Sequence, residues 1–182
     1  MSKITFILGG ARSGKSLYAA KLALNSGNKV LYVATGVPCD EEMKIKIEKH
    51  KKERPESWET IEEPVDIKSV IKNIDNVFDI VIIECLSFWI SNLFFQYKSK
   101  EKDNDNEKIL KNIMDYVIDT FNLFKNLKTE IIVVSNEVGM GIVPDNEISR
   151  VYRDILGKTN QMMAECAENV FLIVAGISIK IK

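Results

Sequence analysis

One short segment near the amino terminus constrains the fold of this chain more than any other. Gly9–Ser16 reads Gly-Gly-Ala-Arg-Ser-Gly-Lys-Ser and matches the pattern Gly-x-x-x-x-Gly-Lys-Ser/Thr. The apolar run Ile4–Leu8 precedes it, and a helical pattern over Lys15–Leu24 overlaps its end. A strand, a glycine-rich loop and a helix in this order point backbone N–H groups at a phosphate. The segment therefore predicts a P-loop within an α/β fold.

The positions of this loop have separate chemical roles. Its glycines let the backbone curl around phosphate oxygens, Lys15 is expected to reach the β- and γ-phosphates, and the Ser16 hydroxyl is expected to ligate Mg²⁺. We expect nucleotide contacts from all eight residues: Gly9, Gly10, Ala11, Arg12, Ser13, Gly14, Lys15 and Ser16. The loop thus predicts binding of a nucleoside triphosphate.

The rest of the chain alternates between apolar and amphipathic runs, which is typical of helices covering a mostly parallel sheet. Strands are expected at Ile4–Leu8, Lys29–Thr35, Asp79–Glu84, Glu130–Ser135 and Val170–Ala175. Helices are expected at Lys15–Leu24, Glu41–Glu53, Val65–Ile74, Leu86–Tyr97, Glu107–Leu127 and Asp145–Glu168. The alternation over 177–181 favours an antiparallel hairpin at the C-terminal edge of the sheet, and the polar run Lys98–Lys108 is interpreted as a solvated loop.

Length and composition restrict the class of protein and its partners. We expect the 182 residues, 46% hydrophobic and 28% charged, to form one globular domain over 1–182. The net charge of −1 argues against nucleic acid or an anionic membrane as partner, because both are held by cationic excess. The apolar runs are too short to span a bilayer. The unpaired Cys39, Cys85 and Cys166 favour a reducing, cytoplasmic location.

A carboxylate is expected close to the P-loop. A P-loop requires an acidic residue at the end of a neighbouring strand, where it holds the metal or a metal-bound water. The apolar strand Asp79–Glu84 ends in such a residue, so Glu84 is a candidate Mg²⁺ ligand together with Ser16. Glutamate stands where aspartate is more familiar, which favours a water-mediated contact. The alternative is a strand that simply reaches the surface at Glu84.

The chain has a single histidine, His50. Met43, Ile47 and His50 fall on one helical face, which is typical of a packed histidine. Six cations surround it in the sequence: Lys44, Lys46, Lys49, Lys51, Lys52 and Arg54. These cations disfavour the imidazolium form and favour phosphate binding, and a neutral imidazole can attack phosphorus. The residue types leave a packed or solvated histidine and a catalytic one as open alternatives.

Further segments complete a wider pattern that spans essentially the whole chain. They are Leu31–Thr35, Glu42-Met43, His50-Lys51, Arg54-Pro55, Trp58, Glu84-Cys85, Ser135–Pro144, Gly176-Ile177 and Lys180–Lys182. Together with the P-loop, they resemble the bifunctional adenosylcobinamide kinase/adenosylcobinamide-phosphate guanylyltransferase family. The run Asn-Glu-Val-Gly-Met-Gly at 136–141, combined with a P-loop and a lone histidine, is far more specific than the P-loop alone.

The resemblance implies two reactions in the assembly of the cobalamin coenzyme. In the first, ATP or GTP phosphorylates the aminopropanol hydroxyl of adenosylcobinamide. In the second, GMP passes from GTP to adenosylcobinamide phosphate through a GMP-histidine intermediate, which the resemblance places on His50, and pyrophosphate leaves. It also implies a RecA-like P-loop fold, use of Mg²⁺ and assembly as a homotrimer.

The resemblance further implies nucleotide contacts outside the P-loop. They are Ala34, Thr35, Gly36, Lys51, Lys52, Glu53, Arg54, Glu62 and Glu84. Two other functions stay open as alternatives. The first is a small-molecule P-loop kinase in which His50 has no chemical role, and the second is a nucleotide-binding regulator without enzymatic activity.

Overall fold

A seven-stranded sheet forms the centre of the molecule. The computed structural model describes residues 3–26, 29–74, 76–101 and 105–182. The strands follow the order β3-β2-β4-β5-β1-β6-β7 across the sheet. Their bounds are β1 Ile4–Gly9, β2 Val30–Ala34, β3 Glu59–Glu62, β4 Ile80–Glu84, β5 Glu130–Asn136, β6 Asn169–Val174 and β7 Ile177–Lys180. Neighbouring strands pair in parallel except β6 and β7, so the predicted antiparallel edge hairpin is confirmed.

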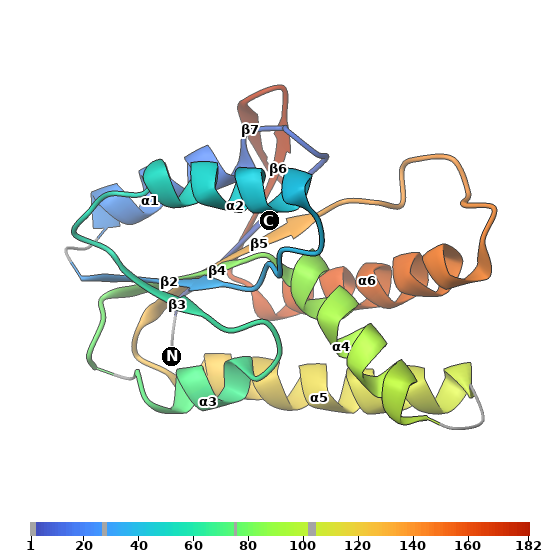
Figure 1. Ribbon diagram of the computed structural model, residues 1–182. Coiled ribbons are helices and arrows are strands. Elements are labelled where there is room, and N and C mark those ends of the chain that lie inside the picture. The colour runs from blue at the N-terminus through green and yellow to red at the C-terminus, as the bar shows by residue number, and fades with distance from the viewer. Residues whose placement is uncertain (1–2, 27–28, 75, 102–104) are drawn as a thin grey trace.

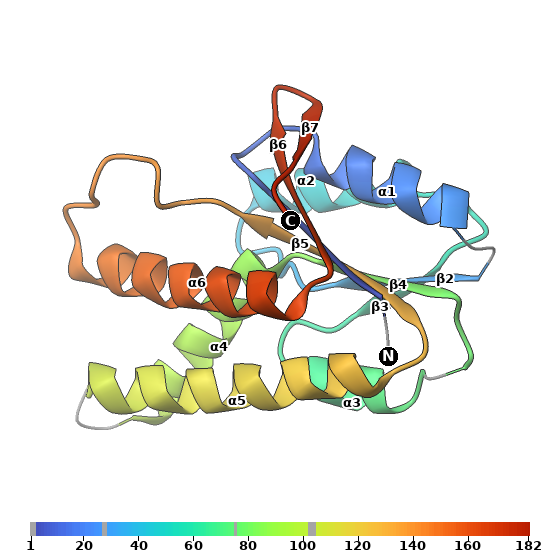
Figure 2. The ribbon, with the colours of Figure 1, turned by 180° about the vertical axis from the view of Figure 1, so that it is seen from behind.

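Helices cover both faces of this sheet. Their bounds are α1 Lys15–Ser26, α2 Glu41–Lys52, α3 Ile67–Lys72, α4 Leu86–Lys100, α5 Asn106–Asn126 and α6 Glu147–Cys166. Figure 1 and the reverse view in Figure 2 place α1 and α2 on one face and α3, α4, α5 and α6 on the opposite face. Among the described segments, no helix is both long and apolar enough to cross a membrane.

Two hydrophobic clusters lie on the two faces of the sheet. Alternate residues of β1 divide between them, because successive side chains of a strand point to opposite faces. Ile4 and Phe6 belong to the larger cluster with the helices α3 to α6, and Ile7 belongs to the smaller cluster with Ala19 and Ala23 of α1. The central strands β1 and β4 are mostly apolar because both of their faces are covered.

The structure differs from the sequence interpretation in two places. Strand β3 was not predicted, because all four of its residues are exposed and it has neither an apolar run nor an alternating pattern. The predicted bounds of the loop Lys98–Lys108 are wrong at both ends, since α4 continues to Lys100 and α5 begins at Asn106. Residues 102–104 of that run lie outside the described part of the chain. Polar helix ends of this kind are solvated and look like loop in a sequence.

The carboxyl ends of the parallel strands meet at one edge of the sheet. Gly9 of β1 pairs with Asn136 of β5, and Glu84 of β4 lies between Val134 of β5 and Ala34 of β2. Ligands of open α/β sheets bind outside this edge. The residues singled out by the sequence therefore converge at the position where a binding site is expected.

Candidate active site

The predicted P-loop turns from β1 into α1. Two of its residues adopt left-handed backbone, Arg12 with φ 56° and Gly14 with φ 100°. A Cβ atom on Gly14 would lie 3.3 Å from Gly176 Cα, so the loop and the β6–β7 turn are in close contact there. The Gly176 backbone N–H also donates to the Ser13 carbonyl at 2.8 Å. The loop shape thus depends on the glycine that the sequence pattern specifies.

Polar groups of the loop are arranged for an anion. Lys15 is largely buried, and its Nζ donates to the Gly10 carbonyl at 2.7 Å. Burial lowers the pKa of Lys15 from its ordinary value, while the nearby Glu84 opposes that shift. Ser13 Oγ is buried and has no hydrogen-bond partner among the described residues. An unpaired buried hydroxyl is costly, and a phosphate oxygen supplies the acceptor it lacks. The loop therefore fits a phosphate group.

Glu84 lies at the centre of the site. The sequence analysis placed Glu84 on a strand next to the P-loop strand β1. In the structure, β5 lies between β1 and β4, the strand that ends in Glu84. Ser16 Oγ nevertheless donates to Glu84 Oε1, and the Tyr32 hydroxyl donates to Glu84 Oε2 at 2.8 Å. Glu84 thus turns inward, and the alternative of a strand that merely surfaces there is wrong. Hydroxyl and carboxylate oxygens are the ligands that Mg²⁺ prefers, so Ser16 and Glu84 fit a bound Mg²⁺.

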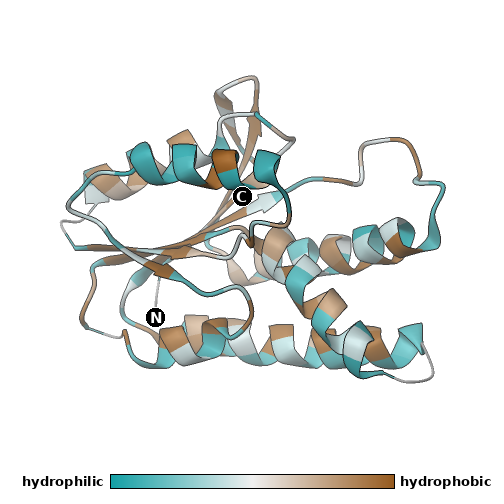
Figure 3. Ribbon diagram, in the orientation of Figure 1, coloured by the Kyte–Doolittle hydropathy of each residue, from teal (hydrophilic) through white to brown (hydrophobic). Residues whose placement is uncertain are grey.

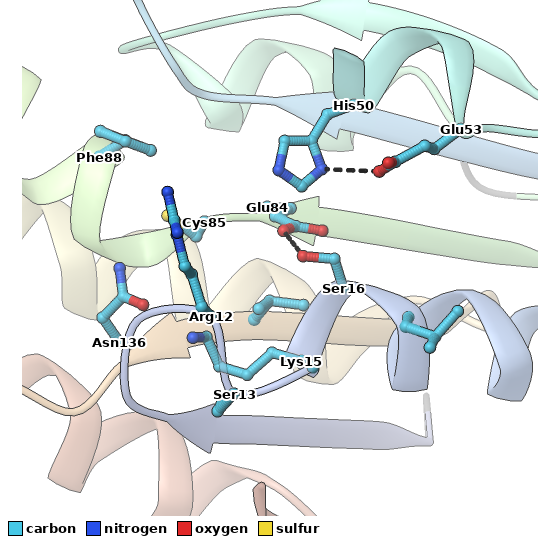
Figure 4. A pocket seen from close by; sticks show the side chains of 13 residues that line it. Arg12, Ser13, Lys15, Ser16, His50, Glu53, Glu84, Cys85, Phe88 and Asn136 are labelled. Carbon is cyan, nitrogen blue, oxygen red and sulfur yellow. Dashed lines mark hydrogen bonds and ion pairs between the residues drawn. The ribbon is translucent and has the colours of Figure 1, made fainter. Parts of the chain in front are cut away.

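A cavity of about 380 Å³ joins the P-loop to the only histidine. Residues Arg12 to Ser16 form one side of it, and His50 and Glu53 from the end of α2 form another. In Figure 4 the imidazole of His50 faces the Ser16–Glu84 pair across the cavity, with Lys15 on the far side of that pair. The structure therefore brings His50, Lys15, Ser16 and Glu84 around a single space.

His50 is not a packed histidine. None of the residues of α2 is buried, and the side chain of His50 is 50% exposed. Its Nδ1 lies 3.7 Å from Glu53 Oε2, a carboxylate that the sequence analysis named only as a nucleotide contact. A ring oriented through one nitrogen leaves the other nitrogen for a substrate. The interpretation of His50 as a packed histidine is thus wrong, and a solvated histidine and a catalytic histidine remain as alternatives.

Most cations of α2 are paired with carboxylates, which lie along the helix, at its end or on strand β3. Figure 3 shows that this helix is largely hydrophilic. The ion pairs are Lys44 with Glu41, Lys46 with Glu42, Lys49 with Glu53, and Lys51 with Glu48 and Glu62. The hydrogen bond that Lys51 donates to Glu62 raises the pKa of Lys51. The positive patch expected from the sequence is therefore largely neutralised by these carboxylates.

The other predicted contacts divide between neighbouring hollows. A second hollow of about 620 Å³, called here the outer hollow, lies between the end of α2 and strand β3 and is lined by Lys51, Lys52, Arg54 and Glu62. A third hollow of about 470 Å³ shares His50, Glu53 and Glu84 with the P-loop cavity and Arg54 with the outer one. The predicted contacts thus line a chain of adjoining hollows that begins at the P-loop.

Three predicted contacts lie at the end of β2. Thr35 is fully buried, and its hydroxyl donates to the Cys85 carbonyl and accepts from the Cys85 N–H. Its side chain thus fixes the residue after Glu84 and lines none of the three hollows. Ala34 pairs with Glu84 in the sheet, and Gly36 lies beside Phe88.

Sequence reasoning missed Tyr32, Phe88 and Asn136 as site residues. Phe88 and Asn136 line the P-loop cavity, and Tyr32 binds Glu84. Asn136 could have been found, because it follows a predicted strand and the carboxyl ends of parallel strands share one edge. The contact of Tyr32 depends on the register between β2 and β4, for which the sequence has no local signal.

Comparison with known proteins decides the family. A family model described as cobinamide kinase / cobinamide phosphate guanyltransferase matches residues 5–181. The chain belongs to this family. A relative from Escherichia coli K12, named bifunctional adenosylcobalamin biosynthesis protein CobU, is 37% identical over 97% of this chain and 98% of its own. A Pseudomonas aeruginosa relative, bifunctional adenosylcobalamin biosynthesis protein CobP, is 37% identical over 97% of this chain and 95% of its own. The predicted family and the prediction of an enzyme are confirmed.

The fold of this cobinamide kinase family member also has solved counterparts. An ATPase from the type III secretion system of pathogenic bacteria superposes with a TM-score of 0.55 at 10% sequence identity. The match covers 98% of this chain and 56% of that one. At this identity the similarity concerns the fold alone. The predicted RecA-like P-loop fold is confirmed.

Proposed function

We propose that this protein phosphorylates the aminopropanol hydroxyl of adenosylcobinamide and then transfers GMP from GTP to the resulting phosphate. The observation that supports both steps is the shared cavity, which the P-loop lines together with His50. The P-loop serves a triphosphate in either reaction, and His50 serves only the second. Family membership over residues 5–181 favours the same pair of reactions.

In the kinase step, the chain's own groups hold the nucleotide and neutralise charge. Backbone N–H groups of the P-loop bind the phosphates, Lys15 moves from the Gly10 carbonyl to the β- and γ-oxygens, and Ser13 Oγ donates to a phosphate oxygen. Positioning and charge neutralisation make up most of the catalysis of phosphoryl transfer. The donor is ATP or GTP, and adenosylcobinamide supplies the attacking hydroxyl.

A bound Mg²⁺ supplies charge neutralisation at the phosphates. We propose that Ser16 and Glu84 hold it, because their hydroxyl and carboxylate are in contact beside the cavity. Ser16 donates a hydrogen bond to Glu84, which leaves the lone pairs of Ser16 Oγ available to the cation. Glu84 acts either as a direct ligand or through a bound water.

In the guanylyltransfer step, His50 is the proposed nucleophile. The nitrogen not facing Glu53 attacks the α-phosphorus of GTP, a phosphoramidate bond to GMP forms, and pyrophosphate leaves. The phosphate of adenosylcobinamide phosphate then displaces His50 and takes the GMP. Glu53 keeps the ring oriented, and the contacts proposed for Lys51, Lys52, Arg54 and Glu62 extend the nucleotide site into the outer hollow.

Labelling tests this proposal. Protein incubated with α-labelled GTP and Mg²⁺ should acquire label that is stable in alkali and lost in acid, as a phosphoramidate is. His50→Ala should abolish that label and guanylyltransfer, while phosphorylation of adenosylcobinamide stays within about threefold of wild type, because the P-loop is intact. Label that survives in His50→Ala would remove this histidine from the mechanism.

Lys15→Ala is the companion variant, since the P-loop serves both steps. Both rates should fall at least about a hundredfold, because a buried phosphate contact made in each transition state is lost. The two variants also separate the alternatives. A kinase without guanylyltransfer gives no label in wild type, and a non-enzymatic regulator binds nucleotide without turnover of either substrate.

The setting of the enzyme is also part of the proposal. We propose one domain over 1–182, a cytoplasmic location and a homotrimer. Free Cys39, Cys85 and Cys166 support a reducing compartment. The segment between β5 and α6 carries exposed Met140 and Ile142, 81% and 97% exposed, and exposed apolar side chains of this kind favour contact with another subunit.

A further inference from the structure

Each oxygen of the Glu84 carboxylate accepts one hydrogen bond from a hydroxyl group. Ser16 Oγ donates to Oε1 from the P-loop side, and the Tyr32 hydroxyl donates to Oε2 at 2.8 Å from strand β2. A carboxylate held at both oxygens has a fixed rotation about its last bond. Without Tyr32, Oε2 would lose the one partner that the structure gives it, and the carboxylate could turn away from Ser16.

Tyr32 itself is held by the segment that follows α2. The guanidinium carbon of Arg54 lies 3.7 Å from the centroid of the Tyr32 ring, and the ring of Trp58 stacks at 6.5 Å with an interplanar angle of 24°. Arg54 Nε is buried without a hydrogen-bond partner in the described structure, and the guanidinium lies over the face of the aromatic ring. The same segment continues directly from the helix end that carries His50.

We propose that Tyr32 is a positioning residue. It orients Glu84 so that Oε1 accepts the hydrogen bond from Ser16, which leaves the lone pairs of Ser16 Oγ free to bind Mg²⁺. Tyr32 acts through Glu84 and touches no reacting atom. The inference rests on the proposed use of Mg²⁺ with a nucleotide.

The chain contains a matched pair that serves as a control. On the opposite face of the sheet, the Tyr116 hydroxyl donates to Asp66 Oδ1, also at 2.8 Å. Lys68 lies over the Tyr116 ring at 4.1 Å, as Arg54 lies over Tyr32. Tyr116→Phe therefore removes the same kind of bond, from a tyrosine to a carboxylate under a cation, at a place remote from the P-loop.

Calorimetric titration with guanosine 5′-(α,β-methylene)triphosphate provides a readout that does not depend on turnover, because this analogue cannot release GMP. The measured quantity is the gain in affinity when Mg²⁺ is added. Tyr32→Phe should reduce that gain about tenfold, the loss typical of one hydrogen bond to a charged group, and should leave the affinity without Mg²⁺ within about twofold. Tyr116→Phe should retain the wild-type gain.

Two results would overturn the inference. One is a Tyr32→Phe protein with the full Mg²⁺ gain, and the other is an equal loss of affinity with and without Mg²⁺, which is what a purely structural role produces. Wild type that fails to bind the analogue at all would instead refute the proposed function. The two failures are thus distinguishable.

A double-mutant cycle protects the test against a general effect on folding. In a Glu84→Gln background the Tyr32 hydroxyl has no carboxylate to orient, so adding Tyr32→Phe should change the Mg²⁺ gain by less than about twofold. A further tenfold loss in that background would show that Tyr32 acts independently of Glu84 and would refute the coupling.

Discussion

Glu84 is a half-buried carboxylate whose cost is offset by hydroxyl donors. Taking an ionised group out of water is unfavourable unless hydrogen bonds replace the lost solvent. Ser16 and Tyr32 provide one such bond to each oxygen, and neither brings a formal charge of its own. The negative charge of Glu84 therefore stays available to a cation beside the P-loop.

Gly14 offers a direct test of the loop at the scale of one residue. Gly14→Ala places a Cβ on a backbone with φ 100° and 3.3 Å from Gly176 Cα, so we expect a loss of about 1–2 kcal/mol in the free energy of unfolding. Nucleotide affinity should fall with it, because the loop must shift. Urea unfolding and calorimetry measure the two quantities.

Gly10→Ala is the control for that substitution. A Cβ at Gly10 has no described atom within 4 Å, and its φ is not in the left-handed region, so stability should stay within about 0.5 kcal/mol of wild type. Equal destabilisation by the two alanines would mean that backbone conformation and the contact with Gly176 are not what makes Gly14 necessary.

The residues of the P-loop could be predicted because their pattern is local and has a chemical meaning. Lys15 and Ser16 lie where the sequence placed them, and Glu84 was found because an apolar strand ending in an acid is unusual. The partners of those groups could not be predicted. Tyr32 reaches Glu84 only through strand register, and the 3.7 Å approach of Glu53 Oε2 to His50 Nδ1 depends on both side-chain conformations as well as on the i,i+3 spacing.

Helix α2 shows how an element can bear a functional side chain without belonging to the core. None of its residues is buried, and it is held by its cap, by ion pairs within the helix and by the ion pair of Lys51 with Glu62 of β3. Asp40 accepts the Met43 N–H at 2.7 Å at its first turn. Exposed ion pairs each contribute little, so the helix is only weakly stabilised and can move relative to the P-loop.

Asp40→Ala should therefore affect one reaction more than the fold. Loss of the cap lowers the stability of α2 alone by about 1 kcal/mol. The fraction of time that His50 faces the cavity should therefore decrease. We expect slower formation of the GMP label, an unchanged kinase rate and an almost unchanged melting temperature. Labelling kinetics and thermal unfolding measure these effects.

Asp105→Ala provides the contrast within the same chain. Asp105 caps α5 by accepting the N–H groups of Glu107 and Lys108, and α5 buries Phe121 and Phe124 in the larger cluster. Its loss should lower the free energy of unfolding by about 1 kcal/mol and leave both reactions unchanged. A fall in guanylyltransfer in this variant would contradict the separation between α2 and the core.

At the scale of the whole molecule, the alternation of apolar strands and amphipathic helices was enough to predict the layered architecture. The strand order was not predictable, because β5 enters between β1 and β4 and pairs with residues far away in the sequence. Edge strand β3 could not be predicted from the sequence for a related reason. A strand with exposed faces is stabilised mainly by pairing with its neighbour, and pairing leaves no pattern of hydrophobicity.

The proposed homotrimer leads to a prediction about the exposed segment between β5 and α6. Ile142→Asp should convert the assembly to monomers at micromolar concentration, because a charge would enter an apolar contact. Sedimentation velocity measures the outcome. Ile118→Asp, on the outer face of α5 at 42% exposure, should leave the assembly intact. An Ile142→Asp protein that still sediments as a trimer would place the subunit contact elsewhere.

The hydrogen bond from Gly176 to Ser13 has a consequence for the timing of synthesis. The turn that closes against the P-loop is translated after almost all of the sheet, since Gly176 follows Ser13 by 176 − 13 = 163 residues. At ribosomal rates of about 5–20 residues per second, roughly 10–30 s separate them. We therefore expect the glycine loop of a nascent polypeptide to lack this support, and to acquire tight affinity for triphosphates only as the β6–β7 hairpin leaves the ribosome.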